Sequence, residues 1–145
     1  MDFFTSMKMS ASGLNAQTKR MNTISSNIAN AETTRTPEGG PYRRKDPVFT
    51  TKEIGTSFGE YLDNELNDYV EGVEVAEIAK DERPARLVYN PSHPDANREG
   101  YVAMPNVNTV EEMANMISAQ RSYEANVTAM AAAKSMAQKA LEIGR

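Results

Sequence analysis

The stretch of residues 109–143 carries an unbroken helical pattern, and its length restricts the folds that are open to the chain. Apolar side chains recur there at alternating spacings of three and four, which predicts a single amphipathic helix. At about 1.5 Å per residue, such a helix is on the order of 50 Å long. A compact domain of 145 residues needs no helix of that length. We therefore expect the helix to bury its apolar side in an assembly.

Residues at both ends of this stretch predict where the helix begins and ends. Thr109 and Glu112 have the spacing of a capping box, in which the hydroxyl and the carboxylate each accept a hydrogen bond from a backbone N–H of the first turn. Gly144 follows the last periodic residue, where a left-handed C-cap is common.

Residues 3–30 mirror this pattern and predict a second amphipathic helix. Ser10, Ser12 and Gly13 lower its helix propensity, so the isolated helix should be weak. We expect the apolar rows of both helices, called here the N-terminal seam and the C-terminal seam, to face each other and to form subunit interfaces. The N-terminal seam consists of Phe4, Met7, Ala11, Leu14, Met21 and Ile28, and the C-terminal seam of Met113, Met116, Ile117, Tyr123, Val127, Met130, Ala137 and Leu141.

The middle of the chain, residues 31–108, is predicted to form only short elements, because it holds all seven Pro and six of the eight Gly residues. Short β-like runs predict strands at 47–51, 72–78, 85–90 and 100–105, and apolar spacing predicts a short helix at 57–69. We therefore divide the chain into an N-terminal axial helix (1–34), a small β-rich domain with its linker (35–108) and a long C-terminal helix (109–145).

These elements predict a mainly α fold with a small β-rich insert. The long N- and C-terminal helices would pair as a coiled-coil-like hairpin or tube layer, with the central β domain on the outside. The insert is too small to cover both seams along their full length, which again indicates assembly with other chains.

Composition excludes several classes of function. A net charge of −4 argues against a general nucleic-acid binder, and no apolar run is long enough to span a membrane. The N-terminus lacks the apolar core of a secretory signal peptide. The chain has no Cys and a single His, so neither a nucleophile–base pair nor a metal site can be assembled readily. We expect no catalytic residues, no cofactor, no metal and no small-molecule substrate.

His93-Pro94-Asp95 matches the signature tripeptide of J-domain co-chaperones, but a β-like run precedes it where that domain has a helix. A turn built from Pro and Asp is the simpler interpretation. The basic cluster at 42–46 is most simply a solvated face, with an acidic protein neighbour as the alternative.

Two stretches strongly resemble bacterial flagellar rod proteins: "SASGLNAQTKRMNTISSNIANAETTRTPEGGPYRR" near the N-terminus, and the chain from "LVYNPSHPDANREGYVAMP" to the C-terminus. The segment "TTRTPEGGPYRRK" narrows the resemblance to a proximal-rod member of that family. The residues that carry the N-terminal motif are Ser12, Gly13, Leu14, Gln17, Asn27, Ile28, Ala29, Asn30, Thr33, Thr34, Pro37, Gly39, Gly40, Pro41, Tyr42, Arg43 and Arg44.

The resemblance implies a structural subunit of the basal-body rod, the drive shaft that transmits torque across the periplasm. It implies assembly with other copies of the chain, with proximal and distal rod proteins, with the linker protein FliE and with the membrane-embedded MS ring. It also implies export by the flagellar type III apparatus without a cleaved signal peptide. Family members have terminal helices that become ordered on assembly.

The polar and turn residues of the motif also receive expected roles. Asn27, Asn30, Thr33 and Thr34 would satisfy backbone groups at the helix end and bond across to neighbouring subunits. The Pro and Gly residues at 37–41 would then stop the helix and turn the chain outward.

Two other hypotheses remain open at this stage. The chain could be a soluble homodimer whose terminal helices form a four-helix bundle, with the β insert as a binding module. It could also be an enzyme that uses carboxylates such as Asp63, Glu65 or Asp95, which would require a pocket with a raised-pKa acid.

Overall fold

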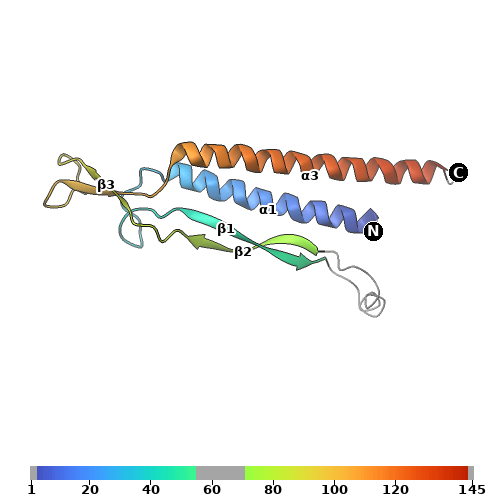
Figure 1. Cartoon of the computed structure of the whole chain (residues 1–145), viewed down its shortest axis with the longest axis horizontal. Coiled ribbons are helices and arrows are strands. Elements are labelled where there is room, and N and C mark those ends of the chain that lie inside the picture. Colours follow the sequence, from blue (N-terminus) through green and yellow to red (C-terminus); the bar gives the residue numbers. More distant parts are fainter. Residues whose placement is uncertain (1–2, 55–70, 144–145) are drawn as a thin grey trace. The chain divides into compact units, whose positions relative to one another are not determined.

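The computed structural model describes residues 3–54 and 71–143, and it places one long helix toward each end of the sequence (Figure 1). Helix α1 spans Phe3–Ala29 and helix α3 spans Thr109–Ile143. The strands that lie between them in the sequence are β1 (Lys45–Glu53), β2 (Glu71–Lys80), β3 (Arg86–Tyr89) and β4 (Tyr101–Met104). The fold is therefore mainly helical with a small β region between the two helices in sequence, as predicted.

Neither of the two described helices combines the length and the apolar character that a membrane crossing requires.

The described strands form two small sheets. Strand β1 is hydrogen-bonded to β2, and β3 pairs antiparallel with β4 in a register that places Arg86 opposite Met104 and Tyr89 opposite Tyr101. Each of the four predicted β runs overlaps one of these strands, so the strand predictions are confirmed. The predicted helix at 57–69 and the predicted C-cap at Gly144 lie outside the described residues.

The chain divides into two compact units, each of which is assembled from separated stretches of sequence. The first unit comprises Met1–Lys19, Phe49–Ala76 and Gln120–Arg145, and the second comprises Arg20–Val48 and Glu77–Ala119. Both units contain a stretch of each long helix and of β1 and β2, whereas β3 and β4 belong to the second unit alone. The division into three consecutive zones stays a prediction.

In the first unit, small residues bring α1 close to its neighbours. A Cβ atom added at Gly13 would lie 3.0 Å from Oδ1 of Asn126, so the absence of a side chain at Gly13 allows this close contact between α1 and α3. Ser12 connects α1 to β2, because its hydroxyl donates to the Met9 carbonyl (2.7 Å) and accepts from the Val73 N–H (3.1 Å).

In the second unit, α3 begins at the predicted residue but with a different cap. The Asn108 side chain accepts a hydrogen bond from the Val110 N–H at 3.1 Å, which is the geometry of an N-cap residue. Both carboxylate oxygens of Glu112 accept from other groups, the side chains of Asn27 and Arg44. The predicted capping box of Thr109 and Glu112 is therefore wrong, because buried partners from other segments hold the carboxylate.

The residues that the two helices bury are mostly small or polar, and they are not the predicted seams. On α1 they are Ala16, Thr23, Ile24 and Asn27, and on α3 they are Glu112, Ala119 and Ala133. Five seam residues are exposed instead: Phe4, Met113, Ile117, Val127 and Leu141. These exposures do not fit the expectation that the two seams pack against each other within one chain. The role of the seams as subunit interfaces stays a prediction.

We predict that Gly72→Ala destabilises the first unit. An added Cβ would lie 2.7 Å from Oγ of Ser12 and 2.9 Å from Cγ1 of Ile54, and such overpacking costs about 1–3 kcal/mol. Urea denaturation measures the loss in the free energy of unfolding. The exposed Ala76→Ser change in the same strand should cost less than about 0.5 kcal/mol. Equal stability of Gly72→Ala and the wild type would contradict the close approach.

Candidate functional site

A buried polar network joins the end of α1, the start of β1 and the start of α3 within the second unit. We call it the polar junction and define it as Asn27, Tyr42, Arg44, Lys45 and Glu112. Three of these residues, Asn27, Tyr42 and Arg44, belong to the rod-family motif that the sequence indicated. The junction therefore brings Asn27 together with Tyr42 and Arg44, which lie 15 and 17 positions further along the chain.

Asn27 is fully buried, and its side chain uses its whole hydrogen-bonding capacity. Its Nδ2 donates to the Lys45 carbonyl (2.8 Å) and to Oε2 of Glu112 (2.9 Å). Its Oδ1 accepts from the Lys45 N–H (3.0 Å) and from the Tyr42 hydroxyl (3.0 Å). The amide thus pairs with both backbone groups of Lys45, as a neighbouring strand would, and fixes where β1 begins relative to the end of α1.

Glu112 is only 1% exposed, and besides its hydrogen bond from Asn27 it forms an ion pair with Arg44. Nε of Arg44 donates to Oε1 of Glu112 at 2.9 Å, and an Arg44 terminal nitrogen pairs with exposed Asp46 at 3.2 Å. Burial acts to lower the pKa of the Arg44 guanidinium, but the hydrogen bonds and charges of Glu112 and Asp46 outweigh it and raise that pKa. The guanidinium therefore stays charged, and the buried carboxylate keeps its counter-ion.

The turn that connects α1 to β1 is held by its own backbone. The Tyr42 N–H donates to the Thr33 carbonyl (3.0 Å), and the Thr36 N–H donates to the Gly40 carbonyl (2.9 Å). Gly39 and Gly40 have φ values of +89° and +76°, which favour glycine because a Cβ is strained there. The structure thus gives a physical reason for the two adjacent glycines of the motif.

Polar motif residues at the end of α1 are satisfied within the chain. Asn30 donates to the Ser26 carbonyl (2.8 Å) and accepts from the Thr33 hydroxyl (3.2 Å). The Thr34 hydroxyl donates to Asp95 at 2.8 Å. The expected satisfaction of backbone groups is seen for Asn27 and Asn30, whereas bonding of these residues to neighbouring subunits stays a prediction.

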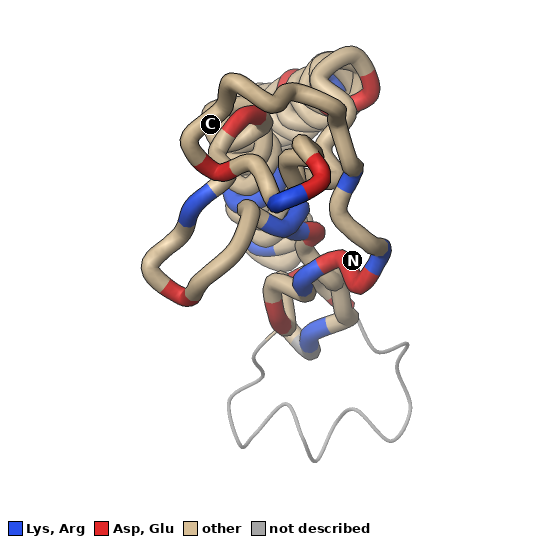
Figure 2. The backbone as a smooth tube through the Cα atoms, turned by 90° about the vertical axis from the view of Figure 1, so that its left-hand side faces the viewer, with Lys and Arg blue, Asp and Glu red and all other residues tan. Residues whose placement is uncertain are grey.

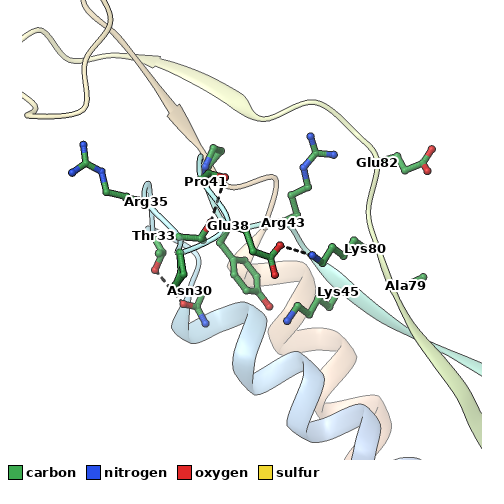
Figure 3. A pocket seen from close by; sticks show the side chains of 14 residues that line it. Asn30, Thr33, Arg35, Glu38, Pro41, Arg43, Lys45, Ala79, Lys80 and Glu82 are labelled. Atoms are coloured by element: carbon green, nitrogen blue, oxygen red, sulfur yellow. Dashed lines mark hydrogen bonds and ion pairs between the residues drawn. The ribbon is translucent and has the colours of Figure 1, made fainter.

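A groove of about 840 Å³ lies beside the turn (Figure 3). Its charged lining consists of four basic residues, Arg35, Arg43, Lys45 and Lys80, and two acidic ones, Glu38 and Glu82. Lys80 pairs with Glu38, and its hydrogen bond lowers the pKa of that carboxyl. We call this surface the basic groove.

Not all motif residues take part in the junction or the groove. Ser12 and Gly13 belong to the first unit, where they contact β2 and α3. Leu14 and Ile28 are half-buried, and Ala29 is exposed. Oε1 of Gln17 is buried without a hydrogen-bond partner in the described part of the chain.

Sequence reasoning missed the central carboxylate of the junction. The spacing of Thr109 and Glu112 predicts a cap, because Glu three residues after Thr is a common helix start. Its burial depends on Arg44, which is 68 positions away, and spacing within one helix carries no signal of that contact.

The single histidine of the chain, His93, lies in the turn between β3 and β4. Nδ1 of His93 accepts from the Asp95 N–H at 3.1 Å, as in a turn, and Asp95 pairs with Arg35 at 2.9 Å. Within residues 3–54 and 71–143, no group of three His, Cys, Asp or Glu side chains is placed to hold a metal ion.

Two family models match the chain, and each matched stretch contains one residue of the polar junction. The model described as "Flagella basal body rod protein" matches residues 7–35, which include Asn27. The model described as "Flagellar basal body rod FlgEFG protein C-terminal" matches residues 98–143, which include Glu112. The polar junction therefore connects the two matched stretches directly.

Relatives match the chain over nearly its whole length. It is 47% identical to the flagellar basal-body rod protein FlgC of Borreliella burgdorferi, over 99% of this chain and 98% of that protein. It is also 47% identical to the FlgC protein of Bacillus subtilis, over 100% of both chains. Identity to the FlgC protein of Salmonella typhimurium is 41%, over 94% of each.

We predict that Arg44→Ala lowers the free energy of unfolding by about 3–5 kcal/mol, because it leaves the Glu112 carboxylate buried without its counter-ion. Asp46→Ala removes the exposed partner of the same guanidinium and should cost about 1 kcal/mol or less. Urea denaturation distinguishes the two. Adding Glu112→Gln to Arg44→Ala should recover part of the loss. Equal losses for Arg44→Ala and Asp46→Ala would contradict the assigned pair.

A second prediction concerns charge at Asn27. Asn27→Asp places a second carboxylate where Nδ2 now donates to Glu112, and two adjacent carboxylates raise the pKa of one of them. The variant should therefore be least stable, relative to the wild type, near neutral pH. Its deficit should shrink as the pH falls through that raised pKa, because the proton restores a hydrogen bond. Urea denaturation at several pH values measures this.

Asn27→Ala serves as the control, since it removes the same hydrogen bonds without adding a titrating group. Its deficit should vary less between neutral and acidic pH. If both variants had the same pH profile, the direct contact of Asn27 with the Glu112 carboxylate would be disproved.

Proposed function

This chain belongs to the FlgC family of flagellar basal-body rod proteins, and we propose that it builds the proximal rod by packing the exposed apolar rows of its two helices against neighbouring subunits. It is a structural subunit of the bacterial flagellar basal body.

The observation that carries this proposal is the exposed apolar surface of α3. In the second unit, Val110, Met113 and Ile117 are 74%, 55% and 54% exposed, and their spacing places them on one face of the helix. In the first unit, Val127, Met136 and Leu141 of the same helix are also exposed. Apolar side chains left uncovered in this number favour a helix that is completed by other chains.

The polar junction supports this assignment from the other side of the helix. The junction holds the start of α3 through Glu112, which binds Asn27. Ala119 lies two helical turns further along the same face of α3 and is also fully buried. The two faces therefore have separate roles. The small and polar face contacts α1, and the large apolar face remains available to a neighbour.

We further propose that α1 and α3 pair in the manner of an antiparallel coiled coil within the rod. Two contacts support this: Gly13 approaches Asn126 in the first unit, and Asn27 binds Glu112 in the second. Fourteen residues separate the contact positions on each helix, which is two heptads. The seam residues would then meet the helices of neighbouring subunits.

The partners that we propose follow from the family. They are other copies of this chain, the proximal and distal rod proteins, a FliE-type linker protein and the MS ring. We also propose export through the flagellar type III apparatus, which suits a chain with no cysteine to oxidise during passage. A rod subunit that transmits torque needs many interlocked contacts and no catalytic group.

A soluble homodimer is the competing hypothesis, since one second copy could also cover the exposed face of α3. A two-fold interface closes on itself, so such a protein stops at two chains. A rod subunit has several non-equivalent neighbours instead, and methionine-rich seams suit that demand because Met side chains adapt to different surroundings.

We predict that Met113→Asp combined with Ile117→Asp abolishes swimming when it replaces the wild-type chain in a bacterium that carries it. Both side chains are exposed, so the purified variant should keep the unfolding free energy of the wild type within about 0.5 kcal/mol. In the rod, burying the two carboxylates against apolar neighbours would cost several kcal/mol. Swimming on soft agar and recovery of rods by electron microscopy measure the effect.

The matched control is Ala125→Asp with Ala132→Asp, which adds the same two charges at exposed positions of α3 that lie outside the C-terminal seam. Swimming should stay near the wild-type level. If the seam variant also swims and the purified chain sediments as a stable dimer, the homodimer hypothesis replaces the proposed one.

A further inference from the structure

We propose that the basic groove binds the acidic residues 60–68 of a second copy of this chain. The inference deepens the proposed function, since it rests on packing between subunits and names one contact that the seams do not supply. It is carried by the lining of the groove and by the distribution of charge along the sequence.

The groove has more positive charge than its own carboxylates neutralise. Among the basic residues that line it, Lys80 pairs with Glu38, and Arg35 pairs with Asp95. Lys45 lies over the Tyr42 ring, with Nζ 5.7 Å from its centroid. Arg43 forms no ion pair with any described residue, and its guanidinium extends away from the Glu38–Lys80 pair (Figure 3). Arg43 is therefore available to an external carboxylate.

Arg43 also borders a second, smaller cavity, which lacks any acidic side chain in its lining. This cavity has a volume of about 200 Å³, and its polar side chains include Arg43, Arg83 and Asn106. Nδ2 of Asn106 is buried without a hydrogen-bond partner in the described part of the chain, while Oδ1 accepts from the Arg44 N–H at 3.0 Å. Arg83 is already paired with Asp81, whereas Arg43 is not paired with any residue that the structure describes. A buried donor without an acceptor, close to the Arg43 guanidinium, is suited to a carboxylate.

The chain itself carries the complementary charge. Residues 53–79 contain eight Asp and Glu residues and no Lys or Arg, and four of these acids, Glu60, Asp63, Glu65 and Asp68, fall within residues 60–68. The rest of the chain is net positive, although the whole chain has a charge of −4. Figure 2 shows that both signs of charge occur along the described backbone. Such separation of charge along one chain favours contact between copies.

A groove on one copy and an acidic segment on the next form a heterologous interface. Each copy can then bind one neighbour through its groove and another through its acidic segment. Repetition of such a contact produces a ring when the rotation between copies closes, and an open helical array when it does not. The open array is the arrangement that a rod requires.

Disulfide trapping tests the contact in the full chain, which has no cysteine of its own. One variant carries Ala79→Cys in the wall of the groove and is labelled with ¹⁵N, and the other carries Asn64→Cys in the acidic segment. The two chains are mixed, oxidised and analysed by mass spectrometry. A disulfide needs Cα atoms about 4.4–6.8 Å apart, so it reports close approach.

We expect the mixed disulfide to exceed either homodisulfide by about five-fold at low salt, and to fall to the roughly two-fold ratio of random pairing in about 1 M salt, where the Debye length is about 3 Å. Ser92→Cys, an exposed position that does not line the groove, should give no such excess with Asn64→Cys. The absence of an excess, or an excess that salt does not reduce, would overturn the proposal. So would rapid intramolecular closure in a chain that carries both substitutions, because the segment would then occupy its own groove.

Charge reversal supplies the second measurement. Arg43→Glu in the groove chain should lower the mixed disulfide to the level of random pairing, and Asp63→Lys with Glu65→Lys in the partner chain should restore most of the excess. Failure of the restoration overturns the groove contact. Because the swimming test of Met113 and Ile117 does not involve these residues, its outcome separates a failure of this contact from a failure of the proposed function.

Discussion

The buried carboxylate of Glu112 is the constraint on which the second unit depends. A carboxylate with almost no access to water must be paired and hydrogen-bonded, and here its partners come from the end of α1 and from the segment after the turn. Asn27 supplies one partner and also binds the backbone of Lys45, so the chain has to return to its own helix within 18 residues. The glycine-containing turn at residues 33–42 is the means by which it returns.

This arrangement separates two tasks that a single helix face usually combines. Contacts inside the chain are made by small or polar residues such as Gly13, Ala119 and Asn126, which allow close approach but bury little apolar area. The larger apolar side chains of α3 point elsewhere and stay exposed. In the proposed rod, such a subunit would obtain modest stability from its own contacts and would offer its exposed apolar side chains to its neighbours. Under this proposal, polar contacts hold separated segments of one chain together, and apolar contacts would join that chain to others.

Local sequence patterns predicted most of the fold, whereas the site depended on contacts that no local pattern records. Helical periodicity located both helices, and β-branched runs between turn residues located the four strands. The motif identified Asn27, Tyr42 and Arg44 but could not show that they share one network with Glu112, because that network spans 85 positions. The seams were chosen by apolar content, yet α1 and α3 meet through smaller residues. Periodicity reveals which side of a helix is apolar, but it does not reveal which partner covers that side.

The spacing of the contacts between α1 and α3 restricts how this chain can change in length. Gly13 meets Asn126 and Asn27 meets Glu112, so equal stretches of the two helices lie between the contact positions. An insertion or deletion in one stretch would shift a glycine or a buried amide out of register unless the other helix changed by the same number of residues. Tolerated changes should therefore occur as matched pairs in the two helices, or be confined to residues outside them. Length differences among relatives would then show which segments lie outside the paired stretches of α1 and α3.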